Sequence, residues 1–477
     1  MANWWAVGLG APAAFLLAFS NGANDIANSM GTIVGANAMT MRQALISGAV
    51  FEFVGAMAIG PFVAGSIAGG QLHTSVFSDD PKLFALLMLS ALIGAGGTTL
   101  LATLYGYPIS ATHGVISGII AVALCTGVPG ALDTSGFSHT LFGWVASPVV
   151  GMLAGMVVSG AVHQLVIAAP DPVKAAKKRQ PLLLTLTAAI SFLFLLLKGP
   201  PIVTGWVDKR YWLAMGLSLL GGMLVTAARA VWSLLHAQDE VLLNRHEKSC
   251  EMTGCATTST TSTPTSLPED GCSEKGGSDV TRSDCGSDMG LEEGSSLPKF
   301  DGVQQPFVSL LMVAGLTVAL AHGANDVGNA VGPLGVLLDP SAVIAAASHH
   351  GHPSLPIASL LLGGIAFVVG ILCLGSRTIS TVGSKITALT PHRSFATQIG
   401  AAVAVLGSSV LGLPVSTSHC LVGAVIGVSL AEKLCGVPDV DLDLNVLRKI
   451  VIGWVVTIPL AAIVAVCSFF PLRWAFH

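Results

Sequence analysis

The apolar runs of this chain constrain its fold more than any other feature. A helix needs about 17–25 mostly apolar residues to span a bilayer, and such runs follow one another along the sequence. Only 10% of the 477 residues are charged, whereas soluble domains carry about 25%. We therefore predict an all-α integral membrane protein with about 10–12 transmembrane segments. The candidate runs are residues 4–20, 43–68, 83–104, 139–169, 182–197, 211–235, 307–321, 355–375, 396–412 and 447–472.

One long segment interrupts this pattern. Residues 237–305 are rich in Ser, Thr, Gly and Asp and poor in large apolar side chains, a composition typical of disordered linkers. The linker separates a first transmembrane repeat (1–170) and two linking transmembrane helices (171–236) from a second transmembrane repeat (306–477). A basic loop favours the cytoplasmic side of a membrane, and the loop before the two linking helices carries Lys174, Lys177, Lys178 and Arg179. We therefore predict a cytoplasmic linker in a multi-pass protein of the plasma membrane.

The two repeats share a pair of short motifs in the same order. GANDIAN (22–28) and GANDVGN (323–329) agree at five of seven positions, 301 residues apart. PISATH (108–113) and PVSTSH (414–419) lie 306 residues apart. Duplicated halves with polar, Gly- or Pro-interrupted apolar segments at matching positions are typical of secondary transporters. Neither terminus carries a basic cluster, which fits extracytoplasmic termini and halves inserted with opposite orientation.

The first motif places polar side chains on one helix face in each repeat. The residues of the two faces are Asn21, Asn24, Asp25 and Asn28, and His322, Asn325, Asp326 and Asn329. Each set is spaced i, i+3, i+4 and i+7. An Asp at mid-bilayer costs about 2.5–3.5 kcal/mol on insertion scales, so each should face the bundle interior and have a partner. No basic residue is near in sequence, which favours a bound cation over simple polar contact between helices. Carboxylate and amide oxygens are hard donors, which suit Na⁺ or Mg²⁺-like ions rather than copper or zinc.

Glycines accompany both polar faces. They are Gly22, Gly31, Gly323, Gly328 and Gly332. Because glycine lacks a Cβ atom, we expect these positions to let the helices unwind and to offer backbone carbonyl oxygens as further ligands.

The second motif combines a helix breaker with hydroxyl residues. Pro108 and Pro414 are each followed by Ser and Thr side chains and then by an apolar helical run. These side chains, Ser110, Thr112, Ser416, Thr417 and Ser418, stand where helix N-caps belong. Free backbone N–H groups, hydroxyls and the positive end of the helix dipole suit an anion, so two such termini could hold a tetrahedral oxyanion without arginine; ordinary capping is the alternative.

Other ionisable residues in the apolar runs have weaker signals. His113 and His419 follow the hydroxyl clusters, and a buried structural role is favoured over a proton relay. Glu52 lies within a predicted membrane helix, so a functional role is the default. Arg377 and Lys385 are read as interfacial residues. The sequence lacks the zinc-protease, nucleophile-elbow and P-loop motifs, so we do not expect an enzyme.

These paired motifs resemble those of the inorganic phosphate transporter (PiT) family, which includes sodium-phosphate symporters. The resemblance covers about residues 10–170 and 307–475 and leaves out the linker. It implies an inverted-repeat fold with broken helices and two re-entrant hairpins that hold phosphate between them. One residue departs from the family pattern, because Gln398 stands where the second half often carries a glutamate, which puts the identity of the coupling ion in question.

The resemblance also implies roles for individual residues. Phosphate binding is assigned to Ser110, Thr112, Ser416, Thr417, Ser418, Gly22 and Gly323. Sodium binding is assigned to Asn24, Asp25, Asn28, Asn325, Asp326, Asn329 and Glu52. Roles in coupling are considered for His113, His419 and Gln398.

The hypothesis from sequence is a symporter that imports inorganic phosphate with Na⁺ by alternating access. One alternative is an H⁺-coupled phosphate permease of the same fold, and the other is a transport-inactive membrane receptor or scaffold. The expected partners are inorganic phosphate, Na⁺, the lipid bilayer and a second copy in a homodimer. Neither a cofactor nor a nucleic acid is expected.

Overall fold

The computed structural model describes residues 4–60, 70–198, 204, 210–252, 301–348, 356–385, 387, 389–410, 415–437, 440 and 442–477. The described residues are almost entirely helical, and one isolated bridge between Leu72 and Leu132 is their only β pairing. Residues 1–226 and 297–477 form one compact unit, and residues 227–296 form a second. The prediction of an all-α protein is therefore confirmed.

The first half of the chain contains long helices joined by short turns. They are α1 (Trp4–Gly35), α2 (Met41–Ala58), η1 (Thr74–Phe77), α4 (Pro81–Leu104), α5 (Ala111–Thr126), α6 (Thr134–Val162), η2 (His163–Ile167), α7 (Pro172–Lys198) and α9 (Tyr211–Met252). Helix α9 continues beyond residue 236, where the sequence predicts the linker to begin. The rest of that predicted linker, from residue 253 to 300, lies outside the described residues.

The second half is also mainly helical in its described residues. Its helices are α10 (Gln305–Asp326), α11 (Gly328–Leu338), α12 (Pro340–Ser348), α13 (Ile357–Lys385), α14 (Pro391–Val410), α15 (Thr417–Leu434) and α16 (Leu444–Phe476). Across the described parts of both halves, eight helical segments are long and apolar enough to cross a membrane. Helix α5 is apolar but shorter, as expected for an arm that enters the membrane without crossing it. The chain is therefore a multi-pass membrane protein.

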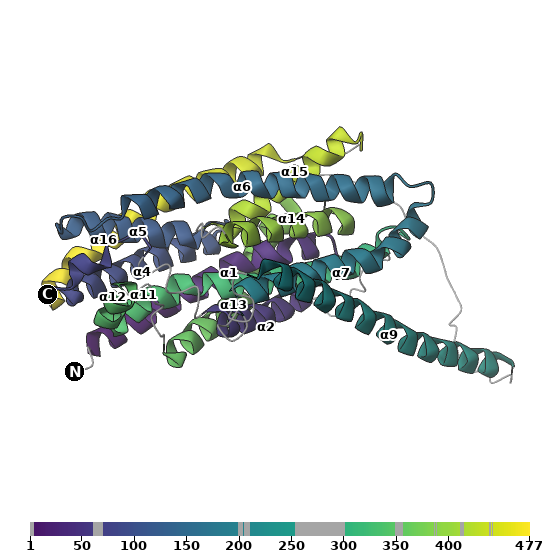
Figure 1. Ribbon diagram of the computed structural model, residues 1–477, viewed down its shortest axis with the longest axis horizontal. Helices are drawn as coiled ribbons and strands as arrows, with labels where there is room; N and C mark the ends of the chain where they lie inside the picture. The colour runs from purple at the N-terminus through teal and green to yellow at the C-terminus, as the bar shows by residue number, and fades with distance from the viewer. Residues whose placement is uncertain are drawn as a thin grey trace, which may run out of the picture. The chain divides into compact units, whose positions relative to one another are not determined.

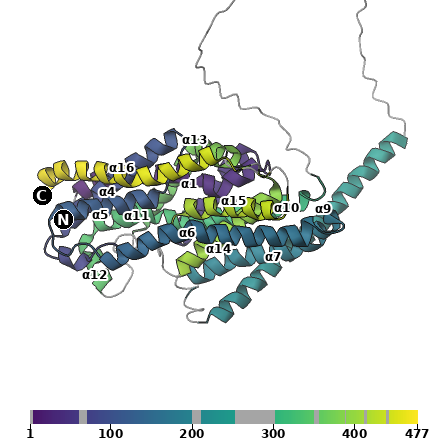
Figure 2. The ribbon, with the colours of Figure 1, turned by 90° about the horizontal axis from the view of Figure 1, so that it is seen from above.

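The helices of the two halves pack against one another reciprocally. Helix α1 packs along α13, and its counterpart α10 packs along α2. The α4–α5 pair lies against α16, whereas the α14–α15 pair lies against α6. Both views show α1 beside α13 and α6 beside α15 (Figure 1, Figure 2). Helices of each half therefore pack against helices of the other.

Two glycines of the signature motifs permit this close packing. A Cβ atom on Gly22 would lie 2.6 Å from the backbone oxygen of Phe367 in α13. A Cβ atom on Gly323 would likewise meet the backbone oxygen of Glu52 in α2. The two glycines therefore serve as contact points between helices, where only a hydrogen atom fits.

The expected unwinding at the signature motifs is wrong for the first half. Helix α1 is continuous from Trp4 to Gly35 and includes the whole first motif. In the second half, the helix is interrupted at Val327, between α10 and α11. The physical reason is that the glycines in α1 are used for close approach to α13, so Gly31 meets Val382 and no change of backbone conformation is needed.

The two hairpins are anchored at opposite ends of the helix bundle. At the end that carries the termini, Trp5 stacks on Phe476 with ring centroids 5.4 Å apart, and Asp80 before α4 contacts His477. We call this the termini end; N and C lie together there in Figure 1. At the other end, which we call the linker end, Gln180 and Gln304 contact residues near the starts of α10 and α14. The α4–α5 pair thus begins and ends at the termini end, and the α14–α15 pair at the linker end.

Candidate functional site

Two of the five hydroxyl residues of the second motif, Ser110 and Ser416, are helix N-caps, whereas Thr112, Thr417 and Ser418 lie in the first turns of α5 and α15. The Ser110 hydroxyl accepts a hydrogen bond from the backbone N–H of His113 at the start of α5, at 3.3 Å. The Ser416 hydroxyl accepts one from His419 at the start of α15, at 3.4 Å. Both helix N-termini therefore present their positive dipole ends and free N–H groups near the same place.

The two capped termini lie next to each other inside the protein. The Ser418 hydroxyl donates to the backbone oxygen of Ile109, at 3.4 Å, and so joins the two hairpin tips. All five hydroxyl residues of the motif are at least nine-tenths buried. An anion held here would receive hydroxyl and backbone N–H donors from both repeats. Pro414 lies outside the described residues.

Asparagines of the first motif connect the signature helices to these hydroxyls. The Asn28 amide nitrogen donates to Thr417 Oγ1 at 3.3 Å and to Ser418 Oγ at 2.9 Å. In the opposite direction, Asn329 donates to Thr112 Oγ1 at 3.3 Å. Each signature helix therefore contacts the hydroxyl cluster of the other repeat. The sequence places both motifs in each half but does not show this exchange.

Three carboxylates lie buried behind the hydroxyls. Asp25 and Asp326 are each 3% exposed, and Glu52 is fully buried. All three lie in or beside α1, which contains Asp25 and whose Asn21 and Ser29 side chains donate to the Asp326 backbone oxygen at 3.1 Å and to Glu52 Oε1 at 3.4 Å. The ion pairs found within the described residues involve other groups, so these carboxylates have no Lys or Arg partner there. Buried carboxylates without a basic partner are expected to be neutralised by bound cations or protons.

Oxygen atoms without partners surround the same region. Buried oxygens that accept no hydrogen bond include Glu52 Oε2, Asp326 Oδ2, Asn21 Oδ1 and Asn329 Oδ1. Carboxylate and amide oxygens are hard donors suited to Na⁺. Within the described ranges, no group of three His, Cys, Asp or Glu side chains is placed to hold a metal ion.

Some predicted cation ligands are already engaged by the protein. The Asn24 amide nitrogen donates to Thr103 Oγ1 and to the Tyr107 backbone oxygen, both at 3.0 Å. Its oxygen accepts from the Ile109 N–H at 2.9 Å. Asn24 therefore holds the tip of the α4–α5 hairpin in place. Asn325 instead donates to its neighbour, Asp326 Oδ1, at 3.1 Å.

The two histidines form the centre of a stack of four aromatic rings. The His113 and His419 rings meet edge to face with centroids 4.6 Å apart. Trp144 of α6 covers His113 at 4.0 Å, and Trp454 of α16 covers His419 at 3.9 Å. The stack joins both hairpins one turn from their N-caps. Sequence reasoning missed the tryptophans, although both stand in a repeated Gly-Trp-Val, at 143–145 and 453–455.

The remaining candidates have distinct positions. Gln398 is fully buried and donates hydrogen bonds to α1. Arg377 is exposed, and its Nη1 donates to the Leu104 backbone oxygen at 2.7 Å, in agreement with an interfacial position. Lys385 ends α13, but its side chain lies outside the described residues.

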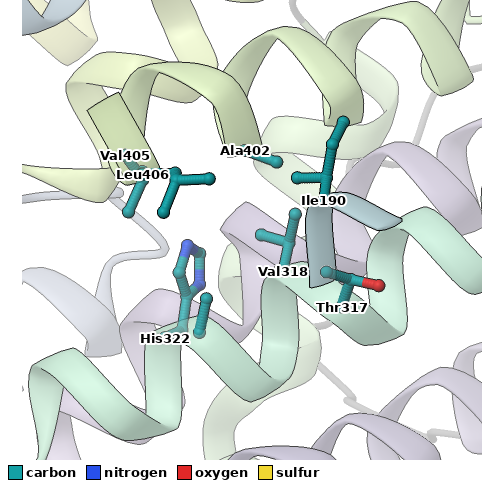
Figure 3. A pocket seen from close by; sticks show the side chains of 8 residues that line it. Ile190, Thr317, Val318, His322, Ala402, Val405 and Leu406 are labelled. Carbon is teal, nitrogen blue, oxygen red and sulfur yellow. The ribbon is translucent and has the colours of Figure 1, made fainter. Parts of the chain in front are cut away.

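A small cavity adjoins the second signature helix but does not coincide with the hydroxyl cluster. His322 points from α10 into it, and the other walls come from α7 and α14 (Figure 3). Its lining is almost wholly apolar, including Ile190, Val405 and Leu406. Such a cavity offers phosphate few hydrogen-bond donors, so the hydroxyl cluster is the better anion site.

The chain is similar to known proteins over most of its length. A model of the "Phosphate transporter family" matches residues 21–465. The Arabidopsis thaliana protein "Inorganic phosphate transporter 2-1, chloroplastic" is 34% identical over 453 residues, which cover 95% of this chain and 70% of that protein. A solved structure titled "The sodium-dependent phosphate transporter" is 28% identical, with a TM-score of 0.70, and covers 98% of this chain and 99% of that one.

The match to the family model includes both copies of the first motif and both copies of the second motif. The likeness to the solved structure extends over nearly the whole chain and supports the same fold. The function is therefore phosphate transport rather than enzymatic catalysis. The chain belongs to the phosphate transporter family.

Proposed function

We propose that the protein is a symporter that moves inorganic phosphate together with Na⁺ by alternating access. The observation that carries the proposal is the position of three buried carboxylates behind two facing helix N-termini. Asp25 is tied to the hydroxyl cluster through Asn28, whose amide donates to both Asp25 Oδ1, at 3.2 Å, and Ser418. Cation and anion sites that share one side chain would favour each other's occupation.

The proposed phosphate site uses neutral donors. Ser110, Thr112 and the hydroxyls at 416–418 would donate to the phosphate oxygens, together with the N–H groups of α5 and α15. The described part of this cluster contains no Lys or Arg. A phosphate that enters such a site must have its charge balanced in another way, and co-bound cations supply that balance.

The proposed cation sites use the carboxylates and the oxygens around them. Asp25, Asp326 and Glu52 would supply negative charge. Asn28, Asn325 and Asn329 would supply amide oxygens. Each amide can turn its oxygen toward a cation once its nitrogen is released from its hydrogen bonds. Asn24 is assigned to support of the α4–α5 hairpin in this structure, although rotation would free its oxygen. Gly22 and Gly323 would allow the close helix contacts that bring the two carboxylate-bearing helices together.

The proposed mechanism follows from the exchanged packing of the repeats. The α4–α5 hairpin starts at the termini end and the α14–α15 hairpin at the linker end, so each could open one side while the other remains closed. The basic residues of the linker end favour the cytoplasm there, and we assign the termini end to the outside of the plasma membrane. Inward movement of surplus Na⁺ would then gain about 2.3 kcal/mol per charge per 100 mV of membrane potential.

The sodium part of the proposal draws support from the solved relative, which is titled a sodium-dependent phosphate transporter. Proton coupling is the second candidate, and the contact between His113 and His419 is the observation in its favour. The test is uptake of radiolabelled phosphate into proteoliposomes under an imposed Na⁺ gradient or an imposed pH gradient. We expect accumulation with Na⁺ at constant pH; accumulation that follows the pH gradient and ignores Na⁺ would replace our proposal with the proton-coupled one.

A further inference from the structure

The side-chain amide nitrogen of Gln398 lies among three oxygen atoms in the interior of the protein. It is 3.2 Å from the Asn28 backbone oxygen and 2.9 Å from that of Ser29. A third oxygen, Thr32 Oγ1, is 2.8 Å away. Gln398 is fully buried in α14, and all three oxygens belong to α1. We call Asn28 O, Ser29 O and Thr32 Oγ1 the α1 oxygen cage.

The oxygen cage determines which way the amide points. A primary amide nitrogen has only two hydrogens, so three nearby oxygens exceed what it can satisfy with linear hydrogen bonds. The opposite orientation would place a fourth oxygen among these three with no hydrogen between them. The amide oxygen, Gln398 Oε1, is buried without a hydrogen-bond partner. The nitrogen therefore occupies the place among hard oxygens where Na⁺ would be held by other side chains.

The cage adjoins the proposed cation region through a shared residue. The Ser29 backbone oxygen accepts from Gln398, while the Ser29 hydroxyl donates to Glu52 Oε1 at 3.4 Å. Asn28 makes the corresponding link to Asp25 through its side chain. The oxygen cage thus lies across α1 from the buried carboxylates, in contact with the same residues.

The first repeat has no polar equivalent of Gln398. The offset of 306 residues that relates PISATH to PVSTSH places Leu92 of α4 at the matching position, and Leu92 is fully buried. The cage is therefore a feature of one repeat only. A residue that held the hairpins symmetrically would be expected in both.

We propose that Gln398 fills the α1 oxygen cage in place of a Na⁺ ion and so limits how many cations accompany each phosphate. This inference rests on the proposed sodium coupling. A carboxylate at the same position would bring an anionic oxygen against three others. That arrangement requires a positive ion between them, so Gln398→Glu converts the filled cage into an additional Na⁺ site.

The test compares the native protein with Gln398→Glu and Gln398→Met in proteoliposomes. The Met variant has a similar volume but neither donates to the cage nor carries charge, so it reports the loss of the hydrogen bonds alone. The measurement is the ratio of ²²Na⁺ to ³²P-phosphate taken up at the same membrane potential. We expect the Glu variant to raise this ratio by one Na⁺ per phosphate and the Met variant to keep the native ratio at a lower rate. A native ratio in the Glu variant would overturn the inference.

An equilibrium measurement covers the case in which the Glu variant does not transport. Thermal unfolding of each detergent-solubilised protein is followed as NaCl replaces choline chloride at constant ionic strength, because a ligand that binds only the folded state raises its stability. We expect Na⁺ to raise the Tm of Gln398→Glu more than that of the native protein or Gln398→Met. Equal shifts in all three would also overturn the inference.

The two proposals fail in different ways. Native protein that takes up phosphate without regard to Na⁺ would contradict the sodium-coupled function, and the detergent measurement would still show whether the cage of Gln398→Glu holds Na⁺. Native protein with clear Na⁺ dependence, together with an unchanged ratio in the Glu variant, would leave the function intact and remove the role given to Gln398.

Discussion

Asn28 joins the two proposed sites, and its replacement by alanine tests that connection. The amide nitrogen orients two hydroxyls of the α14–α15 hairpin, Thr417 and Ser418, by hydrogen bonds of 3.3 and 2.9 Å. A neutral hydrogen bond contributes about 0.5–1.5 kcal/mol. Loss of both would therefore weaken phosphate binding by about 1–3 kcal/mol, which is roughly 5- to 150-fold in affinity.

Asn329 supplies a matched control in the other repeat. Its amide makes one corresponding hydrogen bond, to Thr112 at 3.3 Å, so Asn329→Ala should weaken phosphate binding by only about 0.5–1.5 kcal/mol, roughly 2- to 12-fold. The two substitutions remove the same atoms from related positions. A larger effect at Asn28 therefore reports its additional contacts, to a second hydroxyl and to Asp25 Oδ1 at 3.2 Å, and not the loss of an asparagine in general.

The assay is the phosphate KM for uptake into proteoliposomes at saturating Na⁺, with the Tm of each purified variant measured in detergent. We expect the KM to rise in the order native, Asn329→Ala, Asn28→Ala, with Tm values that permit comparison at the assay temperature. An unchanged KM in Asn28→Ala, or a larger rise in Asn329→Ala, would refute the reasoning that these amides orient the phosphate-binding hydroxyls.

Two further predictions concern stability. Gly323→Ala should lower the Tm, because its Cβ atom would collide with the Glu52 backbone at a cost of about 1–3 kcal/mol. The control is Gly97→Ala in α4, where no atom lies within 4 Å of the added Cβ, and this substitution should raise stability by about 0.5–1 kcal/mol. Equal changes of Tm in the two variants would count against the close packing at Gly323. Partial burial tends to raise the pKa of Asp80, but hydrogen bonds from His477 and the Leu83 N–H outweigh it and lower the pKa below its ordinary value. Because the folded-state pKa is the lower one, the stabilisation is present above the unfolded value of about 3.9 and is lost as pH falls through the folded value. Asp80→Asn should therefore be less stable than the native protein by less than about 1 kcal/mol at pH 6, and the difference in Tm should shrink as the pH falls. A Tm difference that stays constant from pH 6 into acid would contradict this.

The features that the sequence predicts well are those that depend on local spacing. The period of the Asn and Asp residues places Asp25 and Asn28 on one buried face, and both are buried in the structure. The position of Ser110 and Ser416 after a proline turn predicts helix caps, and both caps are present. Such patterns are set by backbone geometry within one or two turns, so a single sequence is enough to show them.

The features that the sequence does not predict depend on contacts between distant segments. Glycine serves both for unwinding and for close packing, so the role of Gly22 could not be assigned until Phe367 was seen beside it. The partners of Gln398 lie on α1, more than 360 residues away. The Trp144 side chain stacks on a histidine of another helix, and only its repeated Gly-Trp-Val context could have drawn attention to it.

The most direct test of sodium coupling through the buried carboxylates is phosphate accumulation driven only by a Na⁺ gradient. Native protein, Asp25→Asn and Asp326→Asn would be reconstituted in equal amounts, and phosphate uptake would be measured at constant pH with Na⁺ outside or with choline in its place. We predict Na⁺-driven accumulation by the native protein and its loss in both variants, because each removes a charge that has no basic partner among the described residues. Undiminished Na⁺-driven accumulation in either variant would contradict the role assigned to that carboxylate.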